Sequence, residues 1–133
     1  MNRETKGEEG RVRLVVGDEL LAELVRLAVE VAPEEACGLL VGRVEGDEAQ
    51  VHEAPRSPNR AADPRIGFEL DPAAWVATED AARGRGLEVL GFWHTHPRGP
   101  AEPSAEDRWF AMPGTWNLVV DVRGGYRAWF QPG

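Results

Sequence analysis

The sequence predicts an α/β domain built on a single mixed β-sheet flanked by helices. Apolar runs of strand length are mixed with stretches of helical periodicity, hairpins are expected at both ends, and 133 residues suffice for one domain with its own core. Apolar residues make up 42% of the chain and charged residues 29%, which fits a packed globular protein and not a disordered one.

The N-terminal part divides into a polar segment and the first elements of the domain. Residues 1–10 are charged and predict a flexible lead-in, so the domain itself is expected over residues 11–133. Residues 11–16 alternate polar and apolar side chains, as a half-buried strand does. Asp18 then predicts the N-cap of a helix that runs to about Val31, because its apolar residues recur at three- and four-residue steps.

The remaining elements are predicted by apolar runs, glycines and prolines. Asp71 before Pro72 indicates a helix start, with a capping residue followed by proline at the first helical position. In chain order we expect a central strand over 36–44, a second strand over 49–55, a loop over 56–66, a helix from Pro72 to near Gly84 or Gly86, a strand over 87–96, a proline-rich loop over 97–103, a short helix over 104–111, and a hairpin of strands 116–122 and 126–130.

Charge and cysteine content exclude several classes of function. The formal net charge of −8 argues against a nucleic-acid partner, which requires a basic surface, and favours a basic one. Cys37 is the only cysteine, so no internal disulfide can form and a reducing compartment is expected. No signal-peptide pattern and no apolar run long enough to span a bilayer occur, so we predict a cytoplasmic protein that does not contact membranes.

Two histidines at a strand end are the first candidate site. His94 and His96 are separated by one residue, so in a strand both side chains project from the same face, together with Leu90 and Phe92. That spacing lets two imidazoles reach one metal ion. Taken alone the pair is weak evidence, because two histidines at a strand end also occur as ordinary polar residues. Trp93 points to the opposite face and is expected in the core.

A serine and an aspartate provide the second half of the candidate site. Ser104 followed three residues later by Asp107 is typical of a capping box, which requires no catalytic role. The two interpretations are compatible, because residues three apart lie on one face of a helix. Two histidines and one carboxylate would leave a fourth tetrahedral position for water, the pattern of a catalytic zinc. Cys37 is a poor ligand candidate, and His52 is interpreted as a surface or edge residue.

A hydrolytic zinc site also needs a base, and the sequence offers two candidates. Glu34 and Glu35 lie directly before the predicted central strand. Two solvated acids between a helix and a strand are equally compatible with the sequence chemistry. The residues alone therefore leave the base unassigned.

Taken together, these residues resemble the JAMM (MPN+) zinc metalloprotease family. The family pattern joins an upstream glutamate to His-x-His-Pro and a downstream Ser-x-x-Asp, and here His94, His96, Ser104 and Asp107 match it, with seven residues between His96 and Ser104. The segment Pro-Glu-Glu-Ala-Cys-Gly-Leu-Leu at 33–40 looks like the family's glutamate segment, which selects Glu35 over Glu34. The resemblance covers about residues 11–131.

The resemblance implies a fold and an activity. The fold is an MPN/JAMM-like sheet, similar to the deaminase-like architecture. The activity is zinc-dependent hydrolysis of the peptide or isopeptide bond after the C-terminal tail of a ubiquitin-like protein. One zinc per chain would be held by His94, His96 and Asp107, with Glu35 as general base and Ser104 as hydrogen-bond donor to the oxyanion.

The short loops at 56–66 and 97–103 look more like those of the compact prokaryotic members, whose partners are small β-grasp proteins used as sulfur carriers or protein tags. The resemblance does not fix the leaving group, and it leaves a homodimer open.

Three alternatives follow from the same residues. A non-catalytic interaction module of the same fold, binding zinc structurally, remains open. A zinc-dependent nucleobase deaminase is excluded, because its Pro-Cys-x-x-Cys signature is absent and one cysteine cannot supply it. A protease with His-Glu-x-x-His on a helix is excluded because that string does not occur.

Overall fold

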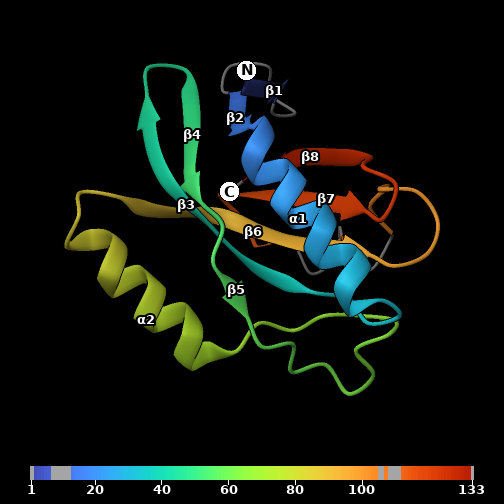
Figure 1. Cartoon of the computed structure of the whole chain (residues 1–133). Coiled ribbons are helices and arrows are strands. Elements are labelled where there is room, and N and C mark those ends of the chain that lie inside the picture. The colour runs from blue at the N-terminus through green and yellow to red at the C-terminus, as the bar shows by residue number, and fades with distance from the viewer. Residues whose placement is uncertain (1, 7–12, 105–106, 108–111, 133) are drawn as a thin grey trace.

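The computed structural model describes residues 2–6, 13–104, 107 and 112–132, which form eight strands and two helices (Figure 1). The strands are β1 (Asn2–Lys6), β2 (Arg13–Gly17), β3 (Cys37–Glu45), β4 (Glu48–Glu53), β5 (Arg56–Ser57), β6 (Glu88–His96), β7 (Thr115–Asp121) and β8 (Tyr126–Gln131). The helices are α1 (Asp18–Val31) and α2 (Pro72–Arg83). The predicted α/β class with one mixed sheet is confirmed. Within the described residues, neither helix has the length and apolar character needed to cross a membrane.

All the strands belong to one sheet whose centre carries the two motif segments. The strand order is β1-β2-β4-β3-β6-β7-β8, and the short β5 pairs with β3 off this path. The pairs β2–β4 and β6–β7 are parallel, and the other pairs are antiparallel. In the β3–β6 pair, Cys37 lies opposite His94. The start of β3 therefore lies beside the histidine end of β6, although Ala36 and Thr95 are 59 positions apart in the sequence.

The two helices pack against different parts of the sheet (Figure 1). The main core cluster joins the apolar stripe of α1, including Leu21 and Leu24, to Trp93 of β6. Trp93 is fully buried, which confirms its predicted core position. On α2, Trp75 packs edge-to-face on Phe92, with ring centroids 4.8 Å apart. Since side chains alternate along β6, Trp93 faces the α1 core and Phe92 faces the side that carries His94.

The N-terminal residues differ from the expectation in two ways. Residues 2–6, predicted as part of a flexible lead-in over 1–10, form β1 and pair antiparallel with β2; the rest of that lead-in lies outside the described residues. Backbone pairing with the edge of β2 makes these residues a strand, and their polar sequence gives no indication of that pairing. Gly17, not Asp18, is the N-cap of α1, because the chain is still extended at Gly17 (φ −68°, ψ 149°). Asp18 instead lies in the first helical turn, where its negative charge interacts favourably with the positive end of the helix dipole.

The segment predicted as a loop over 56–66 begins with strand pairing. Arg56 and Ser57 form β5 against β3, and Asn59 forms an isolated bridge with Leu70. The Asn59 side chain holds the loop closed: its amide donates to the Gly67 carbonyl, and its Oδ1 accepts the Ala61 and Glu69 amides at 3.0 Å each. This segment is therefore ordered by side-chain to backbone bonds that its composition does not reveal.

The later predictions are mostly confirmed. Asp71 caps α2 by accepting the Ala74 amide at 3.2 Å, and β7 and β8 form the expected hairpin. Leu90 was expected on the face of the histidines, but the β3–β6 register skips it and it belongs to the core cluster that holds Trp93. A β-bulge at this position rotates the strand, which a simple two-residue period does not anticipate. Of the short helix predicted over 104–111, the structure describes Ser104 and Asp107 only.

Candidate metal centre and active site

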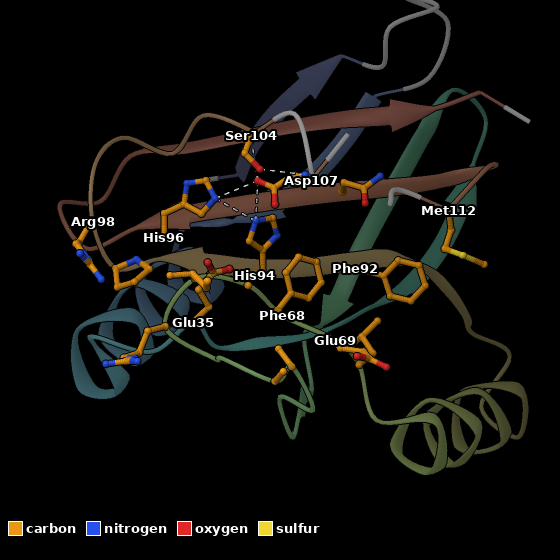
Figure 2. Close-up of a pocket in the computed structure, with 18 of the residues that line it drawn as sticks. Glu35, Phe68, Glu69, Phe92, His94, His96, Arg98, Ser104, Asp107 and Met112 are labelled. Atoms are coloured by element: carbon orange, nitrogen blue, oxygen red, sulfur yellow. Dashed lines mark hydrogen bonds and ion pairs between the residues drawn. The ribbon is translucent and has the colours of Figure 1, made fainter. Parts of the chain in front are cut away.

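Three side chains converge at the end of β6 (Figure 2). His94 and His96 come from the strand, and Asp107 lies beyond the loop that follows it. The His94 and His96 Nε2 atoms are 3.2 Å apart, and Asp107 Oδ2 lies 3.2 Å from the first and 3.1 Å from the second. Among the described residues, these are the histidine, cysteine or acidic side chains that converge closely enough to hold a metal ion.

The triangle formed by these atoms has the size that a tetrahedral metal requires. Ligand atoms that lie 2.0–2.1 Å from a tetrahedral zinc are separated from one another by about 3.3 Å. The three observed separations are 3.1–3.2 Å. Three protein ligands leave one tetrahedral position for water or substrate, whereas structural zinc sites usually have four protein ligands. The residues therefore fit a metal with an open coordination position.

The two imidazoles are held in orientations that suit ligation. His96 Nδ1 lies 3.1 Å from the Pro100 carbonyl oxygen. Because a carbonyl only accepts, Nδ1 carries the proton when this bond forms and Nε2 presents its lone pair to the metal position. His94 is 3% exposed, and its ring is stacked on Phe68, with ring centroids 4.3 Å apart and an interplanar angle of 17°.

Burial and proximity shift the pKa values of the three groups in different directions. Burial lowers the pKa of His94 and outweighs the effect of Asp107, so this imidazole is held neutral. The hydrogen bond with Asp107 raises the pKa of His96 against the effect of burial. Burial alone would raise the pKa of Asp107, but its hydrogen bonds with the two histidines together hold that pKa well below the ordinary value. A neutral imidazole and an ionised carboxylate are the forms that bind a metal.

Ser104 and Asp107 form the predicted capping box. The Ser104 amide donates to Asp107 Oδ2 at 2.9 Å, and the Asp107 amide donates to Ser104 Oγ at 3.0 Å. The Asp107 oxygen in this pair is the one that faces both histidines. Ser104 Oγ accepts in the cap, so its hydroxyl proton stays available to donate to another group.

Backbone bonds fix Glu35 next to this site. Directly after Glu35, the Ala36 amide donates to Thr95 Oγ1 and the Thr95 amide donates to the Ala36 carbonyl, both at 2.9 Å. The Glu35 amide donates to the Pro64 carbonyl at 2.6 Å, and its carbonyl accepts the Asn59 side-chain amide at 2.9 Å. Glu35 is thereby held to the loop before α2, and its neighbour Ala36 is held to the residue between the two histidines.

Glu35 and Glu34 differ in their position relative to the cavity. Glu35 lines it with the two histidines, Ser104 and Asp107, and its side chain lies below His94 and His96 in Figure 2. Its charge adds to the hydrogen bond with Asp107 in raising the pKa of His96. Glu34 is exposed and does not line the cavity. The structure thus places Glu35, the glutamate that the family resemblance selects, and not Glu34, beside the candidate metal site.

The cavity has a volume of about 1070 Å³, and His94, His96 and Asp107 are among the residues that line it. Arg98 lies on the same side as His96 and Glu35, whereas Phe92 and Met112 lie beyond His94 on the other side (Figure 2). The apolar part is lined by Ile66, Phe68, Leu70, Trp75, Phe92 and Met112. This arrangement provides an apolar surface next to His94, His96 and Asp107.

Cys37 and His52, which were not predicted as metal ligands, lie where they were expected. Cys37 is buried, and its Sγ lies 3.8 Å from the Ser57 carbonyl oxygen. Burial raises the pKa of the Cys37 thiol to about 12, so it stays protonated and is a poor ligand even though it lies opposite His94. His52 is exposed on β4.

Sequence reasoning missed Thr95, Asn59 and Phe68 as residues that build the site. Thr95 lies between the two histidines of the His-x-His motif. A hydroxyl on the opposite face of a buried strand needs a hydrogen-bond partner, and this need could have indicated its bond to the backbone. Asn59 was included only in a loop rich in turn residues. Phe68 carries no signal in the sequence, because its stacking on His94 depends on how the loop folds back over β6.

Comparison with known proteins places these features in a family. Residues 17–131 match the family described as prokaryotic homologs of the JAB domain. The chain is 37% identical over 108 residues to a desampylase of Haloferax volcanii, covering 80% of this chain and 76% of that protein. It is 35% identical over 115 residues to a probable TtuB-protein conjugate cleaving protease of Thermus thermophilus, covering 85% of this chain and 72% of that protein.

A solved structure agrees with this placement. The solution structure of protein DSY2949 from Desulfitobacterium hafniense superposes with a TM-score of 0.72 at 32% identity, covering 84% of this chain and 77% of that chain. The fold, the motif geometry and the sequence matches together establish that the chain belongs to the prokaryotic JAB (JAMM/MPN) family.

Proposed function

We propose that the protein is a zinc-dependent peptidase or isopeptidase that cleaves the bond after the C-terminal tail of a small ubiquitin-like protein. The observation that carries this proposal is the His94–His96–Asp107 triangle, with Glu35 and Ser104 lining the same cavity. Relatives that match most of the chain are named a desampylase and a probable TtuB-protein conjugate cleaving protease.

Zinc is the metal that the ligand set supports best. Two imidazole nitrogens and one carboxylate oxygen at tetrahedral spacing suit zinc, and His₂–carboxylate sets are found in catalytic zinc sites. Hard cations such as Mg²⁺ and Ca²⁺ are bound mainly by oxygen ligands instead. One zinc per chain is therefore proposed, held by His94, His96 and Asp107.

Glu35 and Ser104 would then perform the proton transfer and the oxyanion stabilisation. Zinc, when bound, supplies a Lewis acid that makes water a competent nucleophile near neutral pH. Glu35 takes a proton from the attacking water while the water oxygen bonds to the scissile carbonyl carbon. The Ser104 hydroxyl donates to the developing oxyanion. Glu35 delivers its proton to the leaving amine as the carbon–nitrogen bond breaks.

The groove supports a tail as the substrate segment. An extended chain end can lie along the apolar side formed by Phe68, Phe92 and Met112 and place its last carbonyl at the metal position. Ubiquitin-like proteins present such a flexible C-terminal tail. We therefore propose small β-grasp carrier or tag proteins, or their conjugates, as the substrate class.

The alternative of a non-catalytic zinc-binding module is less well supported. A purely structural zinc would normally have a fourth protein ligand and no need for a base beside an open position. Here the ligand group has three members among the described residues, and Glu35 lines the cavity next to it. The arrangement therefore favours the hydrolase.

The Glu35→Gln variant tests the proposal most sharply. Gln cannot accept the proton of water, so cleavage of a ubiquitin-like protein from the same source, fused through its C-terminal glycines, should fall by about 10²- to 10⁴-fold. The zinc content should stay at one per chain, because Glu35 is not a ligand. Cleavage is measured by mass spectrometry and zinc by elemental analysis.

Glu34→Gln is the matched control for this experiment, since it makes the same chemical change one residue away at an exposed position. It should cleave like the wild type. Asp107→Ala should lose both zinc and cleavage. Undiminished cleavage by Glu35→Gln, or an equal loss in Glu34→Gln, contradicts the assignment of the base.

A further inference from the structure

Asp121 is a buried carboxylate at the end of β7 whose two oxygens hold two different segments. It is 6% exposed. Its Oδ1 accepts the Arg123 amide at 2.8 Å and the Gly125 amide at 2.9 Å, which closes the β7–β8 turn. Its Oδ2 accepts the Ala101 amide at 3.0 Å, in the loop that follows the histidine strand. A turn needs only the first set of bonds, so the bond to Ala101 requires a separate explanation.

The Ala101 amide belongs to the same peptide group as the carbonyl that binds His96. The Pro100 carbonyl oxygen lies 3.1 Å from His96 Nδ1 and also accepts the Glu102 amide at 2.8 Å. One peptide plane therefore bonds Asp121 through its N–H and His96 through its oxygen. Hydrogen bonds in such a chain polarise one another, and the negative carboxylate makes the carbonyl a stronger acceptor.

The strand register explains how this chain of bonds is assembled. In the parallel β6–β7 pair, His96 lies directly beside Asp121. The loop leaving β6 turns at Gly99, where φ is +75°, a conformation that glycine adopts without strain. Ala101 then packs in a small apolar cluster with Val119 and Trp129. The loop is thus held over the end of β7 by apolar contacts as well as by Asp121.

We propose that Asp121 is a positioning residue of the metal centre and acts on His96 through the Pro100–Ala101 peptide. Metal-binding histidines commonly donate their second N–H to a carboxylate or a carbonyl, which fixes the tautomer and increases ligand basicity. Here the carbonyl is supplied by a peptide that a buried carboxylate orients and polarises. Asp121 thereby keeps the His96 proton on Nδ1 and its Nε2 lone pair on the metal. The inference rests on the proposed zinc site.

The Asp121→Asn variant tests this inference without relying on cleavage. Asn has the same shape, but if its oxygen keeps the turn amides, its NH₂ group faces the Ala101 N–H and cannot accept from it. We expect zinc affinity, measured by competition with a chelator, to fall by about 10- to 100-fold. In zinc-loaded protein, the His96 Nδ1 proton resonance should shift upfield and exchange faster with water than in the wild type.

Leu24→Ala provides a control of reduced stability away from the site, because Leu24 is a core residue of α1. It should lower the free energy of unfolding and leave zinc affinity and the His96 proton resonance unchanged. If Asp121→Asn does not fold, the wild type still decides the question, because its Ala101 amide and His96 Nδ1 protons must both exchange slowly with water.

The outcomes separate this inference from the proposed function. A wild-type protein that takes up no zinc contradicts the proposed function. If the wild type binds zinc and Asp121→Asn binds it with equal affinity, or if the Ala101 amide proton exchanges rapidly in the wild type, the role of Asp121 alone is overturned.

Discussion

At the scale of single residues, Asp107 combines two interactions in one oxygen atom. Its Oδ2 accepts the Ser104 amide and faces the Nε2 atoms of His94 and His96. The capping box fixes the direction of the carboxylate before any metal binds. A capping motif at this position therefore does not compete with a metal-binding role, because the cap geometry is what directs Asp107 at the histidines.

The buried thiol of Cys37 leads to a prediction of how the free energy of unfolding depends on pH. Burial raises the pKa of its thiol to about 12, compared with about 8.5 in an unfolded chain. Only the unfolded state then ionises between these values, so the free energy of unfolding should decrease as pH rises above about 8.5. At about pH 9 we expect iodoacetamide to alkylate denatured protein quickly and native protein very slowly, as measured by mass spectrometry. Equal rates in both states would show that the thiol is not protected.

At the scale of secondary structure, the candidate active site depends on the junction between β3 and β6. Thr95 is fully buried between the two histidines, and its hydroxyl and amide both bond to Ala36 at 2.9 Å. These bonds connect β6, which carries both histidines, to the residue next to Glu35. The distance between Glu35, the proposed base, and the candidate metal site is thereby set by pairing in the centre of the sheet, where strands are held on both sides.

Thr95→Val tests this junction by removing the hydroxyl at nearly constant shape. It leaves the buried Ala36 N–H without its acceptor, which should lower the free energy of unfolding by about 1–3 kcal/mol. Cleavage should fall because Glu35 is less well held, while both histidines still bind zinc. Unfolding is followed in denaturant and cleavage by mass spectrometry.

Thr95→Ser is the matched control, since it retains the hydroxyl and removes only a methyl group. It should keep most of the cleavage rate. If Val and Ser behave alike in cleavage, the bond to Ala36 does not position the base.

The elements were predicted well where a local pattern determines them. The two-residue period placed His94 and His96 on one face, and the Asp71-Pro72 start of α2 and the final hairpin were also correct. The bulge at Leu90 and the pairing of residues 2–6 were missed, because both arise from a neighbouring strand and not from local sequence. Thr95 and Asp121 were missed for the same reason, since their partners are 59 and 20 residues away. Glu35 was selected over Glu34 only through the family resemblance.

At the scale of the whole molecule, one face of the sheet provides the core and the other provides the chemistry. The α1 side buries Trp93, whereas the opposite side carries His94, with Phe68 stacked on it and α2 packed nearby on Phe92. A single bound ion would join β6 to Asp107 across the loop 97–103. Metal binding should therefore both stabilise the fold and complete the reactive centre. Stability and cleavage should then depend on the same bound zinc.

The dependence of cleavage on zinc is the decisive measurement of whether His94, His96 and Asp107 hold a catalytic metal. Protein treated with a chelator should not cleave the ubiquitin-like fusion, and activity should return in proportion to added zinc and level off at one zinc per chain. Glu35→Gln should take up the same zinc without gaining activity. Cleavage that persists after zinc is removed, or full zinc uptake without cleavage of any ubiquitin-like protein from the same source, would contradict the account.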